Sequence, residues 1–253
     1  MTRSNQIGIS NVILLCALML CSRVSSEENQ GSTRLAREPE SYQTLEMSGW
    51  TIVVNRQLLD EKSEHYELGQ QVQRVLSSHL TMIQHRLPQA AVDKLRTVKI
   101  WLEVSEESPP CAAYHPSREW LVEHSVNPDK AKCVEIANAR RFVEWTRTQP
   151  AMVLHELSHA YHDQFVDGGF RNSQIRGGWE TAVAAELYGD VLHADGELRE
   201  SYAATNEKEF FAELSESFFG TNDFYPFVNA ELKKHDPASH ALIESIWQGD
   251  LSK

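Results

Sequence analysis

The sequence predicts an α+β protein, with a small mixed β-sheet and a helix in its N-terminal half and mainly helices in its C-terminal half. Two observations predict this fold class. Short alternating, β-branched segments occur before about residue 145, whereas stretches with hydrophobic residues at helical spacing dominate after it. We found no internal repeat, so these elements are expected to form one domain with a substantial core.

The N-terminal half is expected to contain a few short strands and one long helix. Residues 50–55 alternate and are rich in β-branched side chains, and residues 98–104 are a second candidate strand. Residues 134–143 are expected to form one or two further strands. Between the first two strands, residues 63–86 predict a helix that ends before Pro88.

Four helices are expected in the C-terminal half. The first covers about 150–165, and a glycine-flanked loop at 168–178 leads into the second at about 179–191. The third covers about 206–219, and its hydrophobic face is Phe210, Phe211, Leu214 and Phe218. The last helix is expected at about 236–247, where Asp-Pro supplies a cap and a first turn.

The first 26 residues are typical of a signal peptide. Arg3 gives a positive start, residues 12–21 are apolar, and Val-Ser-Ser at 24–26 is a small-residue cleavage site. An apolar run of about ten residues is too short to span a bilayer, so no membrane insertion is expected. We therefore expect a secreted protein, extracellular or periplasmic, with a flexible leader at 27–47 and a catalytic domain at 48–253.

Charge and cysteine content limit the candidate partners further. Cleavage after residue 26 removes Arg3 and Arg23 and no acid, which moves the formal charge from −12 to −14. Such an acidic chain is a poor candidate for binding nucleic acid or anionic membranes. The two cysteines that remain, Cys111 and Cys133, are expected to form a disulfide that closes a loop of about twenty residues.

The most informative motif is His-Glu-x-x-His, at residues 155–159. On a helix, His155 and His159 lie one turn apart on the same face, so both rings can bind one Zn²⁺. Glu156 is then placed to accept a proton from the attacking water. The alternative is a surface helix with partly exposed histidines.

Catalytic zinc normally has three protein ligands, so a third ligand is required. His162 lies about 10.5 Å along the helix axis from His155, too far for both rings to bind one ion. The metzincin extension is absent, because His162 replaces its glycine and Phe165 its third histidine. His162 is therefore expected to line the cleft or to support a ligand.

Two downstream carboxylates are candidates for the third ligand. Glu180 follows His159 by 21 residues, but Ala184 stands where a supporting acid is expected one turn later. Glu209 follows His159 by 50 residues and has Glu213 one turn further along the same helix face. Because metal-binding histidines usually need an orienting carboxylate, this pair favours Glu209, although capping or solvent exposure would also explain the two acids.

Residues 201–213, Ser-Tyr-Ala-Ala-Thr-Asn-Glu-Lys-Glu-Phe-Phe-Ala-Glu, are similar to the active-site segment of the anthrax lethal factor protease family. That gluzincin family, which includes the Pro-Pro endopeptidases, combines His-Glu-x-x-His with a later Tyr, a Glu seven residues on and another Glu after four more. Here these are Tyr202, Glu209 and Glu213. The resemblance covers two short blocks. It implies that Glu209 is the third zinc ligand, that Glu213 orients a ligand histidine, and that Tyr202 stabilises the oxyanion.

The sequence therefore predicts a secreted zinc-dependent endopeptidase with one Zn²⁺ per chain and a protein or peptide substrate. The substrate is expected to pair with an edge strand within 135–143. Two alternatives remain open: a zinc-containing extracellular binding protein without turnover, and a zinc hydrolase of cell-wall peptides. A purely structural site needs neither Glu156 nor Tyr202, which favours the enzyme.

Overall fold

A computed structural model describes residues 41–105 and 111–249, which all belong to one compact unit of the chain. The predicted signal peptide and most of the predicted leader lie outside the described residues. No helix in the described ranges is both long enough and apolar enough to cross a membrane.

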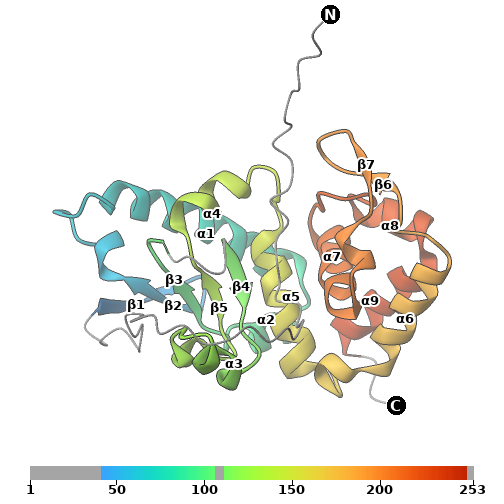
Figure 1. Ribbon diagram of the computed structural model, residues 1–253, viewed down its shortest axis with the longest axis horizontal. Helices are drawn as coiled ribbons and strands as arrows, with labels where there is room; N and C mark the ends of the chain where they lie inside the picture. Colours follow the sequence, from blue (N-terminus) through green and yellow to red (C-terminus); the bar gives the residue numbers. More distant parts are fainter. Residues whose placement is uncertain (1–40, 106–110, 250–253) are drawn as a thin grey trace, which may run out of the picture. The chain divides into compact units, whose positions relative to one another are not determined.

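A five-stranded mixed sheet forms the N-terminal part of this unit (Figure 1). Its spatial order is β1-β2-β3-β5-β4. The strands β2, β3 and β5 run parallel, while β1 and β4 pair antiparallel with β2 and β5 at the two edges. The bounds are β1 Tyr42–Met47, β2 Trp50–Asn55, β3 Ile100–Leu102, β4 Ala112–Tyr114 and β5 Val134–Ile136.

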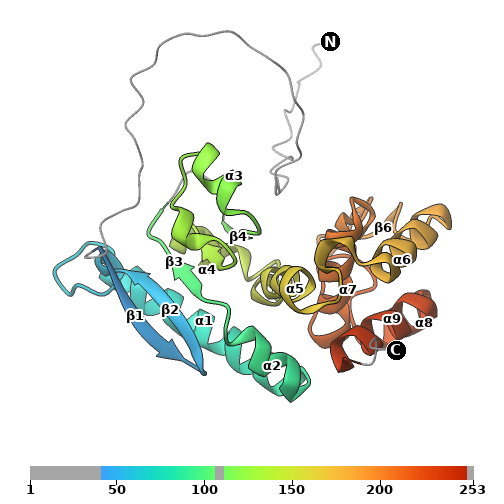
Figure 2. The same cartoon turned by 90° about the horizontal axis from the view of Figure 1, so that it is seen from below.

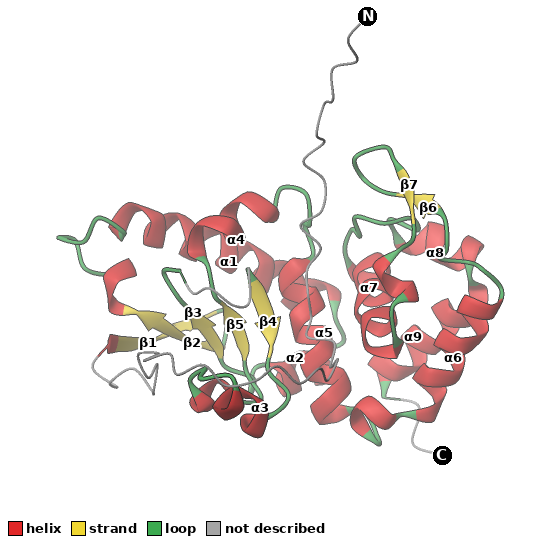
Figure 3. Ribbon diagram, viewed as in Figure 1, coloured by secondary structure: helices red, strands yellow, loops and turns green. Residues whose placement is uncertain are grey.

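The helices account for most of the remaining described residues, as the secondary-structure colouring shows (Figure 3). They are α1 Tyr66–Arg86, α2 Gln89–Leu95, α3 Arg118–Glu123, α4 Ala139–Trp145, α5 Met152–Phe165, α6 Ser173–Ala184, α7 Glu207–Phe219, α8 Asn229–His235 and α9 Pro237–Gln248. Short 3₁₀ turns occur at Arg56–Leu58, Pro128–Lys130, Gly169–Arg171 and Tyr202–Ala204. A small hairpin pairs β6 Val191–Leu192 with β7 Leu198–Arg199. The α+β prediction is confirmed.

The two faces of the sheet differ in chemistry. One face buries side chains such as Ile52, Ile100 and Val134 in the main core, which α1 also joins. The other face carries Glu103 and Glu135, and both carboxylates are completely buried. Burying two charged carboxylates is costly unless each is paired.

Lys130, which is also buried, pairs with both carboxylates. Tyr42 donates a 2.7 Å hydrogen bond to Glu103, and His115 lies 2.6 Å from Glu135. This polar cluster ties the segment between β4 and β5 to the sheet. It therefore fixes the edge strand β4, which lies next to α5 (Figure 1).

Helix α5 lies between the sheet and the C-terminal helices (Figure 2). Every residue from Met152 to His162 is buried, so the alternative of a surface helix with exposed histidines is wrong. Tyr161 stacks on Trp247 of α9, with ring centroids 4.2 Å apart. A helix surrounded by protein on all sides can hold polar side chains only where they find partners.

Three expectations about secondary structure need correction. Residues 42–47 of the predicted leader form β1, because this mostly polar segment is an edge strand whose Tyr42 is buried against the sheet. Residues 134–143 contain one strand and then the start of α4, which begins after Asn138 caps the N–H of Arg141. The helix expected at 179–191 begins earlier, after the Asn172 cap, and ends at Ala184.

The predicted disulfide between Cys111 and Cys133 is wrong, since both are free, buried cysteines. The antiparallel pairing of β4 and β5 gives the reason. The carbonyl of Cys111 accepts from the N–H of Ala137, whereas that of Cys133 accepts from the N–H of His115. The two cysteines thus lie at opposite ends of the pair, roughly 13 Å apart along the strands, and a disulfide needs Cα atoms within about 7 Å.

Candidate metal centre

Helix α5 brings the two histidines of the motif onto one face. His155 and His159 are each 5% exposed, and their Nε2 atoms lie 3.1 Å apart. The rings are nearly perpendicular, with an interplanar angle of 82°. Both Nε2 atoms therefore face the same point beside the helix.

Helix α7 adds Glu209 to this pair. Its Oε2 lies 3.1 Å from Nε2 of His155 and 3.2 Å from Nε2 of His159, and the side chain is buried. A tetrahedral zinc with bonds of about 2.0–2.1 Å keeps its ligand atoms about 3.3 Å apart. Two imidazoles and one carboxylate at these separations fit a zinc ion and leave one coordination position open.

The local sequence explains why α7 presents Glu209 there. Asn206 caps the helix by accepting the N–H groups of Lys208 and Glu209, which fixes where the first turn begins. Glu213 and Glu216 follow at the fourth and seventh positions after Glu209, so the three carboxylates share one face. All three are buried, and this face packs against α5.

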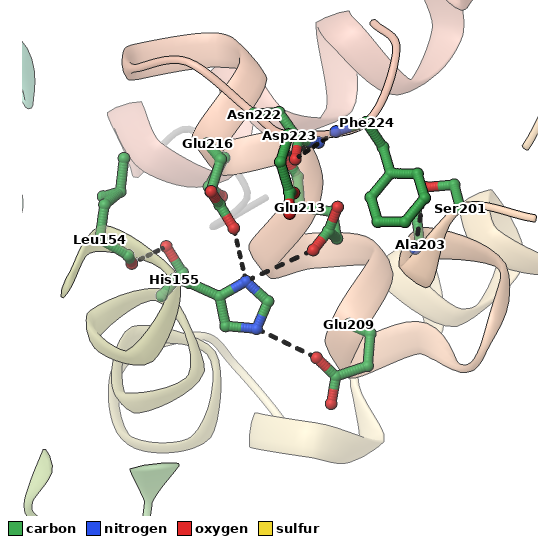
Figure 4. A network of polar contacts seen from close by, with 12 residues as sticks. Leu154, His155, Ser201, Ala203, Glu209, Glu213, Glu216, Asn222, Asp223 and Phe224 are labelled. Atoms are coloured by element: carbon green, nitrogen blue, oxygen red, sulfur yellow. Dashed lines mark hydrogen bonds and ion pairs between the residues drawn. The ribbon is translucent and has the colours of Figure 1, made fainter. Parts of the chain in front are cut away.

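The far side of the His155 ring faces the other two carboxylates (Figure 4). Nδ1 lies 2.6 Å from Oε1 of Glu216 and 3.7 Å from Oε1 of Glu213. The sequence pattern indicated Glu213 for this position and did not include Glu216. The position of Glu216 on the same helix face as Glu209 is the signal that could have identified it.

Neighbouring charges shift the pKa values of these groups. Burial alone would lower the pKa of His155, but hydrogen bonds to Glu209 and Glu216 hold it well above its usual value. Burial alone would raise the pKa of Glu209, but the two histidines it faces hold it well below its usual range. Burial, with Glu216 and Asp223 nearby, raises the pKa of Glu213. Glu209 is thus the carboxylate of this group most strongly held in its charged form.

Glu156 is held by the edge strand β4, whereas His155 is held by α7. Its Oε2 accepts a 2.8 Å hydrogen bond from the backbone N–H of Tyr114, and the side chain is 2% exposed. The Tyr114 hydroxyl donates to Asp163 of α5, at 2.6 Å. Two bonds from one strand residue therefore align β4 with the helix that carries the motif.

Tyr202 lies in the 3₁₀ turn that precedes α7. Its ring is 6.3 Å from that of His155, centroid to centroid, and nearly parallel to it. Ser201 caps this turn by accepting the N–H of Ala203. The turn therefore places the half-buried Tyr202 close to His155.

Two other sequence candidates lie away from the three donor atoms. Glu180, on α6, has a side chain that is 62% exposed and pairs only weakly with Arg176, at 3.9 Å. His162 is completely buried between the rings of Phe170 and Phe211, so it does not line a cleft.

The ring nitrogens of His162 make no well-formed hydrogen bond within the described ranges. The backbone of Gly169 lies close enough to raise the pKa of the ring slightly. Burial is the main reason that its pKa falls to about 3, and the nearby His159 and Lys208 lower it further. His162 is therefore a neutral part of the core.

Comparison with known proteins supports a metallopeptidase. The family described as glucose-regulated metallo-peptidase M90 matches residues 132–248, a segment that includes α5 and α7. Metallopeptidases hold a metal, typically zinc, and act on peptide substrates. The comparisons with curated proteins and with solved structures gave no match.

Proposed function

We propose that this protein is a secreted, zinc-dependent endopeptidase. The observation that carries the proposal is the set of three buried donor atoms, from His155, His159 and Glu209, that lie 3.1–3.2 Å from one another. Glu156 stands next to the first ligand in the chain. The family match over 132–248 supports the class of enzyme.

The chemistry is divided between the metal and the protein. A zinc ion, when bound, polarises the scissile carbonyl and makes water more acidic. Glu156 accepts the proton of the attacking water and passes it to the leaving amine. The N–H of Tyr114 holds one carboxylate oxygen, which leaves the other oxygen of Glu156 to handle the proton.

Tyr202 is proposed to donate its phenolic hydrogen to the oxyanion that forms on the substrate. Its proximity to His155 supports this role. The spacing of Tyr202, Glu209 and Glu213 also supports a relationship to the lethal factor type of gluzincin.

The substrate is proposed to pair with the edge strand β4. The expected location at 135–143 does not suit this role, because β5 is an interior strand and α4 is a helix. Cys111 and His115, which flank β4, bond to the β5 strand and its neighbours, so the backbone groups of Ala112 and Tyr114 point away from β5. The N–H of Tyr114 is already bound to Glu156, which leaves the carbonyl of Tyr114 and both backbone groups of Ala112. These outward groups can bind an extended peptide beside Glu156.

Export is part of the proposal and rests on the signal-like residues 1–26 alone. A tagged full-length chain expressed in its native host should appear outside the cytoplasm with a new N-terminus near Glu27. Retention inside the cell with an intact N-terminus would contradict export, and it would leave the proposed chemistry untouched.

Cleavage profiling of a peptide library tests the proposed activity. Purified wild-type protein should cleave internal peptide bonds. Glu156→Gln should bind zinc equally well but lose cleavage by about 10²–10⁴-fold, since the base is removed. Absence of cleavage by zinc-loaded wild type, including with cell-wall peptides, would favour a binding protein. Equal cleavage by Glu156→Gln would contradict the proposed base.

A further inference from the structure

The ring of His155 contacts carboxylates at both of its nitrogens, and the two contacts have different geometry. Nε2 faces Oε2 of Glu209 at 3.1 Å, together with Nε2 of His159. Nδ1 faces Oε1 of Glu216 at 2.6 Å (Figure 4). A separation of 2.6 Å is that of a short, charge-assisted hydrogen bond, and it is too short for two ligand atoms on one tetrahedral zinc.

The chemistry of imidazole assigns a role to each nitrogen. A neutral histidine that binds a metal through Nε2 must carry its proton on Nδ1. This single N–H can make one strong hydrogen bond, so it selects one acceptor. Glu216 lies within hydrogen-bond distance, whereas Oε1 of Glu213 lies 3.7 Å away, beyond it.

The surroundings of the two acids agree with this selection. Both are buried, but Oε2 of Glu213 has no hydrogen-bond partner among the described residues. Asp223 lies near both carboxyls, but only Glu216 has an oxygen held directly against His155. Glu216 therefore meets the requirement of a carboxylate that orients a ligand histidine, and Glu213 does not.

An alternative is that the metal binds on the Nδ1 side, between His155, Glu213 and Glu216, whose ligand atoms also lie close together. Two of these atoms are at the 2.6 Å separation of a hydrogen bond, and the set contains only one imidazole. The set with two imidazoles has the more regular separations. The geometry thus favours zinc on the Nε2 side, with Glu216 behind the ring.

We infer that Glu216 is the positioning residue for His155: it accepts the Nδ1–H and thereby fixes the tautomer and the orientation of this zinc ligand. Glu213, which the sequence resemblance assigned to this role, is not needed for it. The inference rests on the proposed zinc site. The inference adds a third glutamate to the active-site pattern on α7. Glu216 follows Glu213 by three positions, as Glu213 follows Glu209 by four.

The test measures zinc affinity of the full-length protein by competition with a chromophoric chelator. Glu216→Gln should weaken zinc binding by about 10–100-fold, the usual effect of removing such a partner, and the matched variant Glu213→Gln should change it less than about 3-fold. Glu209→Gln is the reference arm, because it removes a proposed ligand. Zinc-free thermal unfolding of each variant shows whether it has folded.

NMR of the zinc-loaded protein gives a second measurement that a general loss of stability would not mimic. The Nδ1–H of His155 should give a strongly downfield resonance, since its hydrogen bond is short and charged. This resonance should move upfield in Glu216→Gln and stay in place in Glu213→Gln. If Glu216→Gln does not fold, the result for Glu213→Gln is used instead. Unchanged zinc affinity and an unchanged resonance in Glu213→Gln support the inference, and a change in both contradicts it.

The outcomes separate the two proposals. Loss of zinc in Glu209→Gln supports the proposed zinc site. If, in addition, Glu213→Gln weakens zinc affinity and moves the resonance while Glu216→Gln does neither, the inference about Glu216 is overturned and the zinc site stands. If Glu209→Gln binds zinc as wild type does while Glu216→Gln loses it, the ion lies on the Nδ1 side. That result would overturn both proposals.

Discussion

The residues at the proposed zinc site are ionisable and almost fully buried, which is costly in a folded protein unless they are paired. His155, Glu209 and Glu216 are 5%, 3% and 4% exposed. Each one is paired, since His155 bonds to Glu216 on one side and faces Glu209 on the other. Removing a single partner would leave a buried charge uncompensated, at a cost of about 3–5 kcal/mol. Isosteric changes such as Glu→Gln are therefore the informative substitutions here.

Tyr202→Phe tests the proposed oxyanion donor. Removing only the hydroxyl should lower kcat by about 10²–10³-fold, because one hydrogen bond that forms in the transition state is lost. Zinc content and KM should stay close to wild type. The comparison uses initial rates on the best library peptide, and activity within 3-fold of wild type would remove Tyr202 from the mechanism.

His162→Leu tests whether the third histidine of α5 is only a core residue. The ring lies between Phe170 and Phe211 without a well-formed hydrogen bond in the described ranges, so an apolar side chain should fit at no cost or stabilise by up to about 1 kcal/mol. Urea unfolding and zinc content measure the two effects. A loss of zinc, or destabilisation above about 2 kcal/mol, would show that His162 supports the site.

At the scale of elements, the sequence predicted the long helices and the strand β2 well, but it missed the two edge strands β1 and β4. The helices α1, α5, α7 and α9 were expected close to their observed positions, because hydrophobic spacing and caps such as Asn206 define them over several turns. The strand β4 was missed, since three residues are too few to show alternation. Its position at the sheet edge depends on pairing with β5, which is a tertiary property.

The proposed site, too, could be predicted from the sequence only in part. Spacing within α5 predicted that His155 and His159 face one point. The spacing of Glu209 and Glu213 favoured Glu209 as the third ligand, and a resemblance then decided the choice. The contact between Tyr114 and Glu156 could not be predicted, because it joins the unrecognised strand β4 to the helix across 42 positions. The choice between Glu213 and Glu216 depends on how α7 is rotated against α5, which hydrophobic spacing fixes only approximately.

The pairing of β4 with β5 predicts two free thiols in the folded protein. Burial, aided by the nearby Glu156, raises the pKa of Cys111 to about 12, so its reactive fraction at pH 8 is on the order of 10⁻⁴. Iodoacetamide should label neither Cys111 nor Cys133 in the native state. Both should react after unfolding without a reductant. A linked peptide pair in a non-reduced digest, detected by mass spectrometry, would contradict the observed register.

At the scale of the whole molecule, the site depends on parts of the chain that are far apart in sequence. The family match covers 132–248, which includes the proposed ligands, but the residue that holds Glu156 lies before it. The cluster around Glu103, Lys130 and Glu135 connects the sheet to the segment that carries β4. The N-terminal strands are therefore expected to matter for the position of Glu156, the proposed base.

Truncation tests this dependence on the N-terminal sheet. A chain that begins at Ser48 lacks β1, including the buried Tyr42 that bonds to Glu103. Loss of one buried aromatic ring costs about 3–5 kcal/mol, so this chain should be destabilised by at least that much in urea unfolding. The matched control begins at Ser41 and therefore keeps β1. Equal stability of the two chains would contradict the role of β1 in the fold.

The central claim is that His155, His159 and Glu209 hold one zinc ion, and zinc content measured by mass spectrometry of purified protein tests it most directly. After dialysis against a mild chelator, wild type should retain about one zinc per chain. Glu180→Gln is the matched control, since it changes the other candidate carboxylate on an exposed surface, and it should retain the same amount. Glu209→Gln should retain less than about a tenth. Full zinc content in Glu209→Gln, or its loss in Glu180→Gln, would contradict the proposed site.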